Sequence, residues 1–273
     1  MDFGAGPDQY LRGNRSSQPA GSNEMTAIDL NGATVVVTGA SRGFGRATAV
    51  ALAESGAQVV GVARHRGGLE ELQRELGDAL SCETGDVANP ELPGRLFGTY
   101  RPAAVVLNAG APPVIAPLDE HDWDTFSVNW NVDVRQAFHF VQQALRTPPP
   151  NGGVVVTMSS GAALAGSPMS GGYAGAKATV RFIGAYAAEE AARRTIPVRF
   201  VSILPHITNF GTGRLGVRAY AARAGITEEE FIERAGATAT PDQVARHVVD
   251  VIADGSYSAP AYHLAADGLR PLG

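Results

Sequence analysis

The amino-acid sequence predicts one α/β domain built around a mostly parallel sheet. From Leu30 onward, short β-branched runs alternate with longer helical patterns, which indicates repeated βαβ units. Two runs read Val-Val-Val, at 35–37 and 154–156, and continuous apolar runs are typical of parallel strands buried on both faces. A length of 273 residues is compatible with one large domain of this kind.

Each element is expected from its own local pattern. The expected strands are residues 34–38, 58–63, 79–83, 103–107, 154–159, 198–203 and 261–264. The expected helices lie between them, near residues 45–55, 69–76, 90–100, 122–145, 172–194 and 241–253. The run of three prolines at 148–150 is too short for a domain linker, so we interpret it as a loop.

The composition excludes several classes of protein. A formal net charge of −5 leaves no basic excess for nucleic acid, and no stretch approaches the ~20 apolar residues of a membrane span. The six histidines lack the spacing of metal ligands. Cys82 is the single cysteine, so we expect a buried core thiol and no intramolecular disulfide. The sequence therefore predicts a soluble, cytoplasmic protein without a metal site.

The N-terminal segment differs from the rest of the chain. Residues 1–24 are rich in Gly, Asn, Ser, Gln and Pro and show no hydrophobic period, so we expect a disordered leader. They also lack the apolar core of a signal peptide. Met25 could be an alternative start, because the folded pattern begins directly after it, and we assign residues 25–273 to the folded domain.

A second exception is the segment 205–239, which interrupts the alternation of strands and helices. It is rich in Gly, Arg and Ala, and Thr227 followed by Glu230 predicts a helix start with a capping box. An insertion between a strand and the next helix lies at the carboxyl edge of the sheet, where substrate lids occur. We therefore expect this segment to be a substrate lid.

The first expected strand runs into a glycine-rich turn, Thr38-Gly39-Ala40-Ser41-Arg42-Gly43-Phe44-Gly45, followed by an alanine-rich helix. Glycines at such a turn let backbone N–H groups approach a pyrophosphate at the positive end of the helix. The turn also precedes a second strand, as a dinucleotide site requires. We expect Gly39, Ser41, Arg42, Gly43, Phe44 and Gly45 to bind a dinucleotide.

The end of the second strand favours NADP(H) over NAD(H). A cofactor without the 2′-phosphate usually meets an acidic residue there, but this chain has Ala63-Arg64-His65-Arg66. Arg64 and Arg42 offer two guanidinium groups suited to a phosphate dianion, and the alternative is that both are ordinary solvated arginines.

Two further stretches complete the expected cofactor cleft. Asp86, after the third strand, could accept a hydrogen bond from the adenine amino group, and Val87 could pack against the ring. Asn108, Ala109 and Gly110 follow the fourth strand and supply small residues where the backbone must pass close to the cofactor.

The candidate catalytic residues follow the fifth strand. Tyr173 and Lys177 are four apart on an expected helix, so they share one face. A positive neighbour favours the phenolate, so Tyr173 would exchange a proton closer to neutral pH. Ser160 would contribute a hydroxyl that polarises the substrate oxygen.

This ordered set resembles the short-chain dehydrogenase/reductase family. The resemblance rests on Thr38-Gly39-x-x-x-Gly43-x-Gly45, Asp86, Asn108-Ala109-Gly110, Ser160 and Tyr173-x-x-x-Lys177, and it covers residues 28–268. It implies a Rossmann-type, doubly wound sheet of seven parallel strands, commonly assembled as dimers or tetramers. It also implies that Tyr173 is the general acid/base, that Ser160 orients the carbonyl, and that Lys177 holds the nicotinamide ribose.

The sequence departs from the family pattern at two places. Asp133 stands where the family usually has an Asn that holds a water in a proton relay with the lysine. His206 follows Pro205 where the family commonly has Gly, so it could alter the cofactor pose or project into the substrate pocket. Thr208 could still reach the carboxamide of the nicotinamide.

The sequence thus predicts an NADP(H)-dependent oxidoreductase of the ketoreductase kind, acting on a carbonyl/alcohol pair in the reducing direction, with an imine as an allied substrate. We expect a homodimer or homotetramer. Two alternatives stay open. One is a non-redox enzyme, such as a cyclase, epimerase or dehydratase, which the residues at 133 and 206 motivate. The other is a nucleotide-sensing regulatory protein, against which the presence of Ser160, Tyr173 and Lys177 argues.

Overall fold

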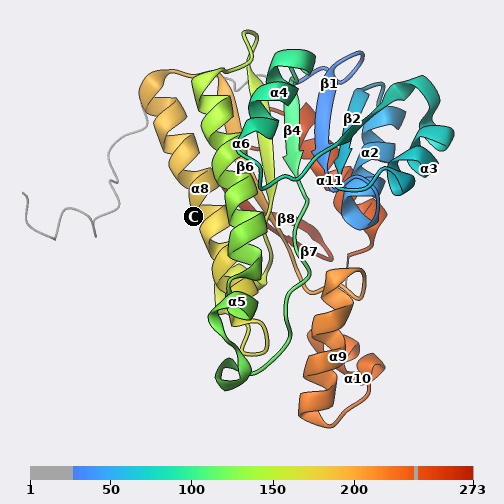
Figure 1. Cartoon of the computed structure of the whole chain (residues 1–273), viewed down its shortest axis with the longest axis vertical. Helices are drawn as coiled ribbons and strands as arrows, with labels where there is room; N and C mark the ends of the chain where they lie inside the picture. The colour runs from blue at the N-terminus through green and yellow to red at the C-terminus, as the bar shows by residue number, and fades with distance from the viewer. Residues whose placement is uncertain (1–26, 237–238, 273) are drawn as a thin grey trace, which may run out of the picture.

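The computed structural model describes residues 27–236 and 239–272, which form one sheet with helices on both faces (Figure 1). The predicted leader, residues 1–24, lies outside the described residues. The strand order is β3-β2-β1-β4-β5-β6-β7-β8. The strands are β1 Thr34–Thr38, β2 Gln58–Ala63, β3 Leu80–Thr84, β4 Ala104–Leu107, β5 Gly153–Met158, β6 Val198–Pro205, β7 Ala261–Ala265 and β8 Gly268–Leu272.

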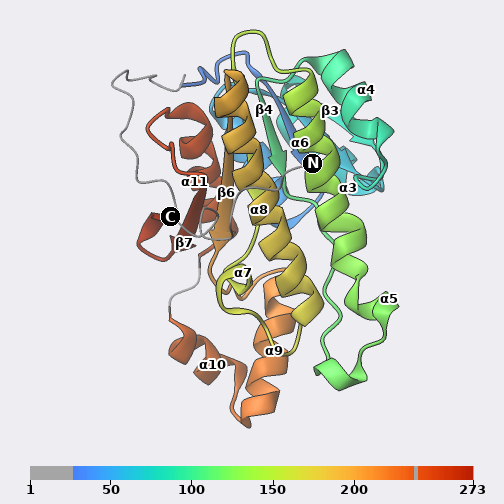
Figure 2. The ribbon, with the colours of Figure 1, turned by 90° about the vertical axis from the view of Figure 1, so that its left-hand side faces the viewer.

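Two layers of helix cover the sheet (Figures 1 and 2). Helices α2 (Gly43–Glu54), α3 (Gly67–Leu76) and α11 (Pro241–Ala253) share one buried cluster with the strands, and α4 (Glu91–Tyr100), α6 (Arg135–Arg146) and α8 (Gly171–Arg194) share the other. A short helix, α7 (Ala162–Ala165), follows β5, and 3₁₀ turns occupy Gly77–Ala79 and Leu118–Glu120. Within the described residues, none of the helices has the length and apolar character that crossing a membrane requires.

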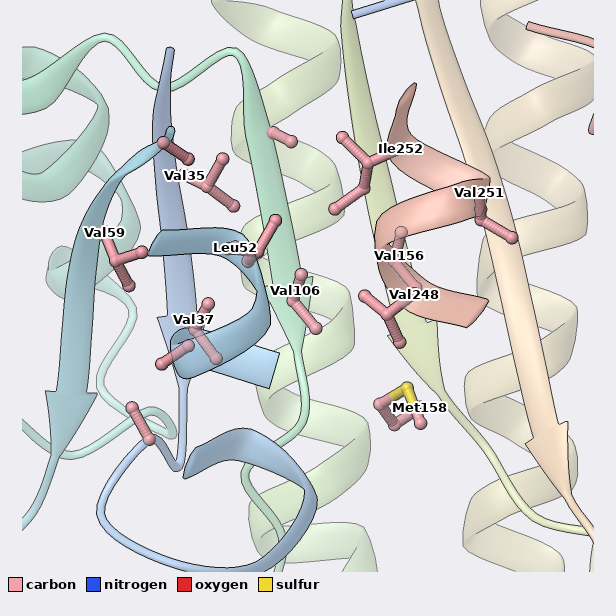
Figure 3. Close-up of a cluster of buried hydrophobic side chains, with 14 of the residues drawn as sticks. Val35, Val37, Leu52, Val59, Val106, Val156, Met158, Val248, Val251 and Ile252 are labelled. Carbon is pink, nitrogen blue, oxygen red and sulfur yellow. The ribbon is translucent and has the colours of Figure 1, made fainter. Parts of the chain in front are cut away.

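The strands alternate their side chains between the two helix layers. Val35 and Val37 point into the cluster that also contains Leu52 of α2 and Val248 of α11 (Figure 3), whereas Val36 belongs to the opposite cluster. All three valines are 0% exposed, and each stabilises the fold by about 1.5–3 kcal/mol through burial. Burial on both faces explains why this strand has an unbroken apolar sequence.

Strands β1 to β7 are all parallel, which confirms the predicted fold class. The strand order reverses between β1 and β4, because β2 and β3 lie on one side of β1 and the later strands lie on the other. In an open sheet of this type, ligands bind outside the carboxyl ends of the strands at such a reversal. The fold therefore places a candidate site after β1 and β4.

The prediction of seven strands was one short. Residues Gly268–Leu272 form β8, which pairs antiparallel with β7 and closes that edge of the sheet. Only Ala266 and Asp267 separate the two strands, as in a tight hairpin. β8 contains Pro271 and is partly exposed, so it lacks the buried apolar run by which the other strands were recognised.

The prediction of one helix over residues 122–145 was wrong. The structure divides this stretch into α5 (Trp123–Phe126), a π-helix, η3 (Trp130–Val134), and α6. Asp122 and Thr125 form a reciprocal capping box that starts α5, and Ser127 ends it. π-Helical turns are uncommon and often mark functional sites. This one carries Asp133.

The segment 205–239 contains two helices, α9 (Thr212–Ala224) and α10 (Glu228–Ala235), and residues 237 and 238 lie outside the described residues. The helix start at Thr227 is confirmed, since its hydroxyl accepts a hydrogen bond from the Glu230 amide. The capping box is not reciprocal, because the Glu230 carboxylate pairs with Arg234. Figure 2 shows both helices beyond the sheet, at the end where α5 also lies.

Candidate functional site

The glycine turn joins β1 to α2 through a close backbone approach. A Cβ atom on Gly45 would lie 2.3 Å from the carbonyl oxygen of Gly39, so glycine is required there. The Asn108 side chain braces the turn, donating to the carbonyl of Thr38 at 3.1 Å. Helix α2 starts at Gly43 without a side-chain cap from Arg42, so its first amides can bind an anion, as at other helix starts.

A buried hydroxyl ties together the ends of β1 and β4. Thr38 Oγ1 donates to Gln136 Oε1 at 2.7 Å and accepts from the amides of Asn108 and Ala109 at 2.9 and 3.1 Å. The Gln136 amide group returns a hydrogen bond to the Ala109 carbonyl at 2.8 Å. We did not predict Gln136 from the sequence. Gln136 lies three residues after Asp133 on the same helical face, and this spacing could have indicated that Gln136 also faces the ends of β1 and β4.

The centre of the candidate site is a buried ion pair between α8 and η3. Lys177 Nζ lies 3.0 Å from Asp133 Oδ2, and the two side chains are 9% and 1% exposed. The other oxygen of Asp133 accepts from the Ala111 amide at 2.9 Å, and Lys177 also donates to the Met158 carbonyl at 2.9 Å. The pair thus connects the segments that follow β4 and β5.

The charge of Lys177 is stabilised in spite of burial. Burial by itself would lower the pKa of this ammonium, but the nearby Asp133 carboxylate and Tyr173 raise it above its ordinary value. Lys177 Nζ lies 5.7 Å from the centre of the Tyr173 ring. Lys177 is also the single lysine of the whole chain.

Asp133 also explains a glycine after β4. A Cβ atom on Gly110 would lie 2.9 Å from Asp133 Oδ2. Any larger residue would therefore displace the carboxylate that pairs with Lys177. The glycine at position 110 is thus required here by the carboxylate of Asp133.

The two serines after β5 have different surroundings. Ser159 is buried and donates to the Lys177 carbonyl at 2.8 Å, so it fastens α8 to the end of the strand. Ser160 is half-buried, and its oxygen accepts from the Ala162 amide at 3.2 Å. That bond leaves the Ser160 hydroxyl hydrogen available to another acceptor. Together these contacts bring Ser160 to the edge of the sheet where β5 ends. The part of α8 that carries Tyr173 and Lys177 lies at the same edge.

Arg42 and Arg64 lie at that edge as well. Thr38 pairs with Val62 across β1 and β2, so both arginines follow neighbouring strand ends. Both are exposed, and among the described residues neither guanidinium has an ion pair or a side-chain hydrogen bond. Arg66 differs, because it pairs with Glu70 at 2.9 Å.

The residues predicted to contact the adenine have unequal exposure. Asp86 is exposed, and one of its oxygens accepts from the Ala88 amide at 2.9 Å, which leaves the other oxygen open. Val87 is only 4% exposed and belongs to the core beneath α4. Its contact area for a ring is therefore small.

The His206 ring lies between the end of β6 and α10. Its Nε2 is 3.2 Å from the Ala235 carbonyl, and it meets His263 edge-on at 5.5 Å between ring centres. Burial, then the neighbouring His206 and Arg270, hold the pKa of His263 below its ordinary value. Thr208 is buried nearby, and Pro205 accepts from the Gly161 amide at 2.8 Å. These contacts give His206 a role in holding α10.

No group of three His, Cys, Asp or Glu side chains is arranged to hold a metal ion within residues 27–236 and 239–272. The half-buried Cys82 donates to the Leu69 carbonyl, and burial raises the pKa of its thiol.

Comparison with known proteins gives consistent matches. The family model described as short chain dehydrogenase matches residues 33–217. A short-chain type dehydrogenase/reductase of Picea abies is 31% identical over 228 residues, which span 76% of this chain and 82% of that protein. Carbonyl reductase (NADPH) 2 of Sus scrofa is 31% identical over 135 residues, and L-xylulose reductase of Cavia porcellus is 32% identical over 136 residues. Each of these two alignments covers 49% of this chain and 55% of the relative.

Proposed function

We propose, from the premise that the chain belongs to the short-chain dehydrogenase/reductase family, that it transfers a hydride between NADP(H) and a carbonyl/alcohol pair. Lys177 carries this proposal. Its ammonium is held inside the protein by Asp133, at the edge where the strands end, and lies close to the Tyr173 ring. A buried charge of this kind is costly to maintain, and such groups are concentrated at functional sites.

The residues of the glycine turn fit a dinucleotide. Gly45 lets the backbone of the turn pack closely, since a Cβ atom there would lie 2.3 Å from the Gly39 carbonyl oxygen. The amides at the start of α2 suit a pyrophosphate, and the exposed Arg42 and Arg64 suit a 2′-phosphate. When bound, NADPH supplies the hydride. The name of the Sus scrofa relative contains the same cofactor, which agrees with this choice.

The protein's own groups manage the proton and the substrate oxygen. In the reducing direction, Tyr173 donates its phenolic proton to that oxygen, and the Ser160 hydroxyl donates a hydrogen bond to it as negative charge develops. The protonated Lys177 stabilises the phenolate that Tyr173 becomes. Asp133 keeps Lys177 protonated and in place through the ion pair and the Ala111 amide.

The cofactor assignment is tested by titrating purified protein with NADPH and NADH. We expect NADPH to bind more tightly, and Arg42→Ala and Arg64→Ala each to weaken NADPH binding about tenfold, because each removes an exposed charge-assisted contact. NADH binding should change little. Arg66→Ala is the matched control, since Arg66 is engaged by Glu70 and should leave both affinities near wild type. If neither NADPH nor NADH binds, the redox proposal is overturned.

A non-redox reaction at the same site is a second candidate, because the Asp133 carboxylate adds a charge beside Lys177. It is distinguished by product analysis with NADPH absorbance followed in the same cuvette. A cyclase, epimerase or dehydratase would form product without a net change in absorbance. A reductase consumes one NADPH for each product molecule.

We also propose that the protein is a homodimer or homotetramer assembled through α6 and α8. Phe138, Phe182 and Tyr186 are 50%, 49% and 64% exposed on these two helices, which is unusual for aromatic side chains outside an interface. Light scattering should give a mass that is an even multiple of one chain, and Phe182→Glu should reduce it. A wild-type mass equal to one chain contradicts this assembly.

A further inference from the structure

One tyrosine of the proposed lid reaches the segment that leads into α8. Tyr220 lies on α9, and its hydroxyl oxygen is 3.2 Å from the Met169 amide, which donates to it. The same oxygen is 2.8 Å from Ser167 Oγ. The tyrosine oxygen accepts from the amide, and in the contact between Tyr220 and Ser167 either hydroxyl can donate.

The contact continues to the start of α8. Ser167 Oγ lies 2.6 Å from Ser170 Oγ, and Ser170 is the buried residue immediately before the helix. The Ser170 carbonyl accepts from the Ala174 amide at 3.0 Å and so forms the first helical turn. Tyr173 lies in that same turn. Three hydroxyl groups therefore link α9 to the helix turn that carries the proposed acid.

Further contacts fix the same junction. The Tyr220 ring stacks on Phe231 of α10, with 6.0 Å between centres and 10° between planes. Arg223 of α9 donates to the Met169 sulfur at 2.9 Å, and the Met169 carbonyl accepts from the Ala116 amide at 3.0 Å. Tyr220 thus contacts both the second helix of the proposed lid and the segment 166–170, which is itself bonded to the chain after β4.

We infer that Tyr220 is a positioning residue, which holds α9 and α10 against the segment 166–170 and thereby sets the affinity for substrate. This inference rests on the proposed reductase function. Tyr220 acts through Ser167, Ser170 and Phe231, and it contacts none of the proposed reacting groups. Its hydroxyl fixes the distance between the helices and the edge of the sheet, while its ring fixes α10 to α9.

The structural part of the inference is tested by amide hydrogen exchange on the full chain. Tyr220→Phe keeps the stacked ring and removes only the hydroxyl. We expect the amide of Met169 and those of α9 to exchange about 3- to 10-fold faster, as the loss of one or two hydrogen bonds allows. Tyr257→Phe is the matched control, because it also removes only a hydroxyl, from the segment that enters β7 at the opposite edge of the sheet, and it should leave these amides unchanged.

A second variant tests whether the hydroxyls act as one unit. Ser167→Ala should accelerate exchange at the same amides, and the free-energy change in the double variant should be much smaller than the sum of the two single changes. Exchange in Tyr220→Phe that matches wild type over residues 166–170 and 212–224 would overturn the inference.

The kinetic part uses NADPH with a panel of an aliphatic aldehyde, an aromatic ketone and a vicinal diketone. Tyr220→Phe should raise KM by about threefold or more and leave kcat within about twofold, because the hydroxyl supports binding equally before and during the reaction. A fall in kcat at constant KM contradicts a positioning role. If wild type reduces none of these compounds, the proposed function fails, whereas the exchange measurement still decides whether Tyr220 holds the two helices.

Discussion

Replacing Tyr173 by phenylalanine is expected to lower kcat about 10²- to 10⁴-fold, which is the usual contribution of a general acid or base. The substitution removes the phenolic proton and leaves the ring in the first turn of α8. Lys177 keeps its ion pair with Asp133 and its bond to the Met158 carbonyl, since neither contact involves the phenol. NADPH binding should therefore stay near that of wild type.

The measurement is steady-state reduction of the carbonyl panel together with an NADPH titration of the same preparation. Tyr257→Phe serves as the control, because it removes a phenolic hydroxyl from the segment between α11 and β7, at the opposite edge of the sheet. A loss of less than about tenfold would assign the proton transfer to another group.

The fold could be predicted because its central strands are buried on both faces. The predicted bounds of β1 and β2 match the structure, since a run such as Val35–Val37 has no polar face that could make it ambiguous. The glycine turn was equally clear, because a Cβ atom on Gly45 would lie only 2.3 Å from the Gly39 carbonyl oxygen. Local sterics and burial act within a few residues, so they leave a pattern in the sequence.

The features that were missed depend on contacts between distant residues. The division of residues 122–145 into α5, η3 and α6 was missed, because the sequence pattern is periodic enough to suggest one continuous helix. Tyr220 meets Ser167 across 53 positions of sequence, and neither residue belongs to a recognisable motif. The strand β8 is stabilised by pairing with β7 and has little burial of its own. Pairing partners of this kind become visible only in the folded chain.

Removing the carboxylate of Asp133 is expected to destabilise the fold by about 3–5 kcal/mol, because Asp133→Ala leaves the Lys177 ammonium buried without its ionic partner. Asp133→Asn should cost less, since its one amide oxygen can still accept a hydrogen bond from one of the two donors, Ala111 N or Lys177 Nζ. Chemical unfolding at pH 7 gives both free energies. Glu70→Gln, which breaks the exposed pair with Arg66, is the matched control and should remain close to wild type.

The pH dependence of this stabilisation follows from the direction of the pKa shift. The folded-state pKa of Lys177 is raised above that of an unfolded lysine, about 10.4, so the contribution of the pair is fully present below that pH. It is lost as the pH rises through the raised folded-state pKa. In wild type this contribution should therefore be constant from neutral pH to about pH 10 and be lost only above it. In Asp133→Asn burial acts on Lys177 without the carboxylate, so the difference in unfolding free energy between the two proteins should begin to shrink at a lower pH.

The pKa of Lys177 can be measured directly by nuclear magnetic resonance. Lys177 is the single lysine of the chain, so ε-¹³C-labelled lysine gives one side-chain signal. In wild type that signal should titrate above the ordinary lysine range. In Asp133→Asn the attraction of the carboxylate is gone and burial remains, so the pKa of Lys177 should fall below its wild-type value. An unchanged titration in the variant would mean that Asp133 does not hold the charge on Lys177. The proposed proton transfer by Tyr173 would then need another source of positive charge.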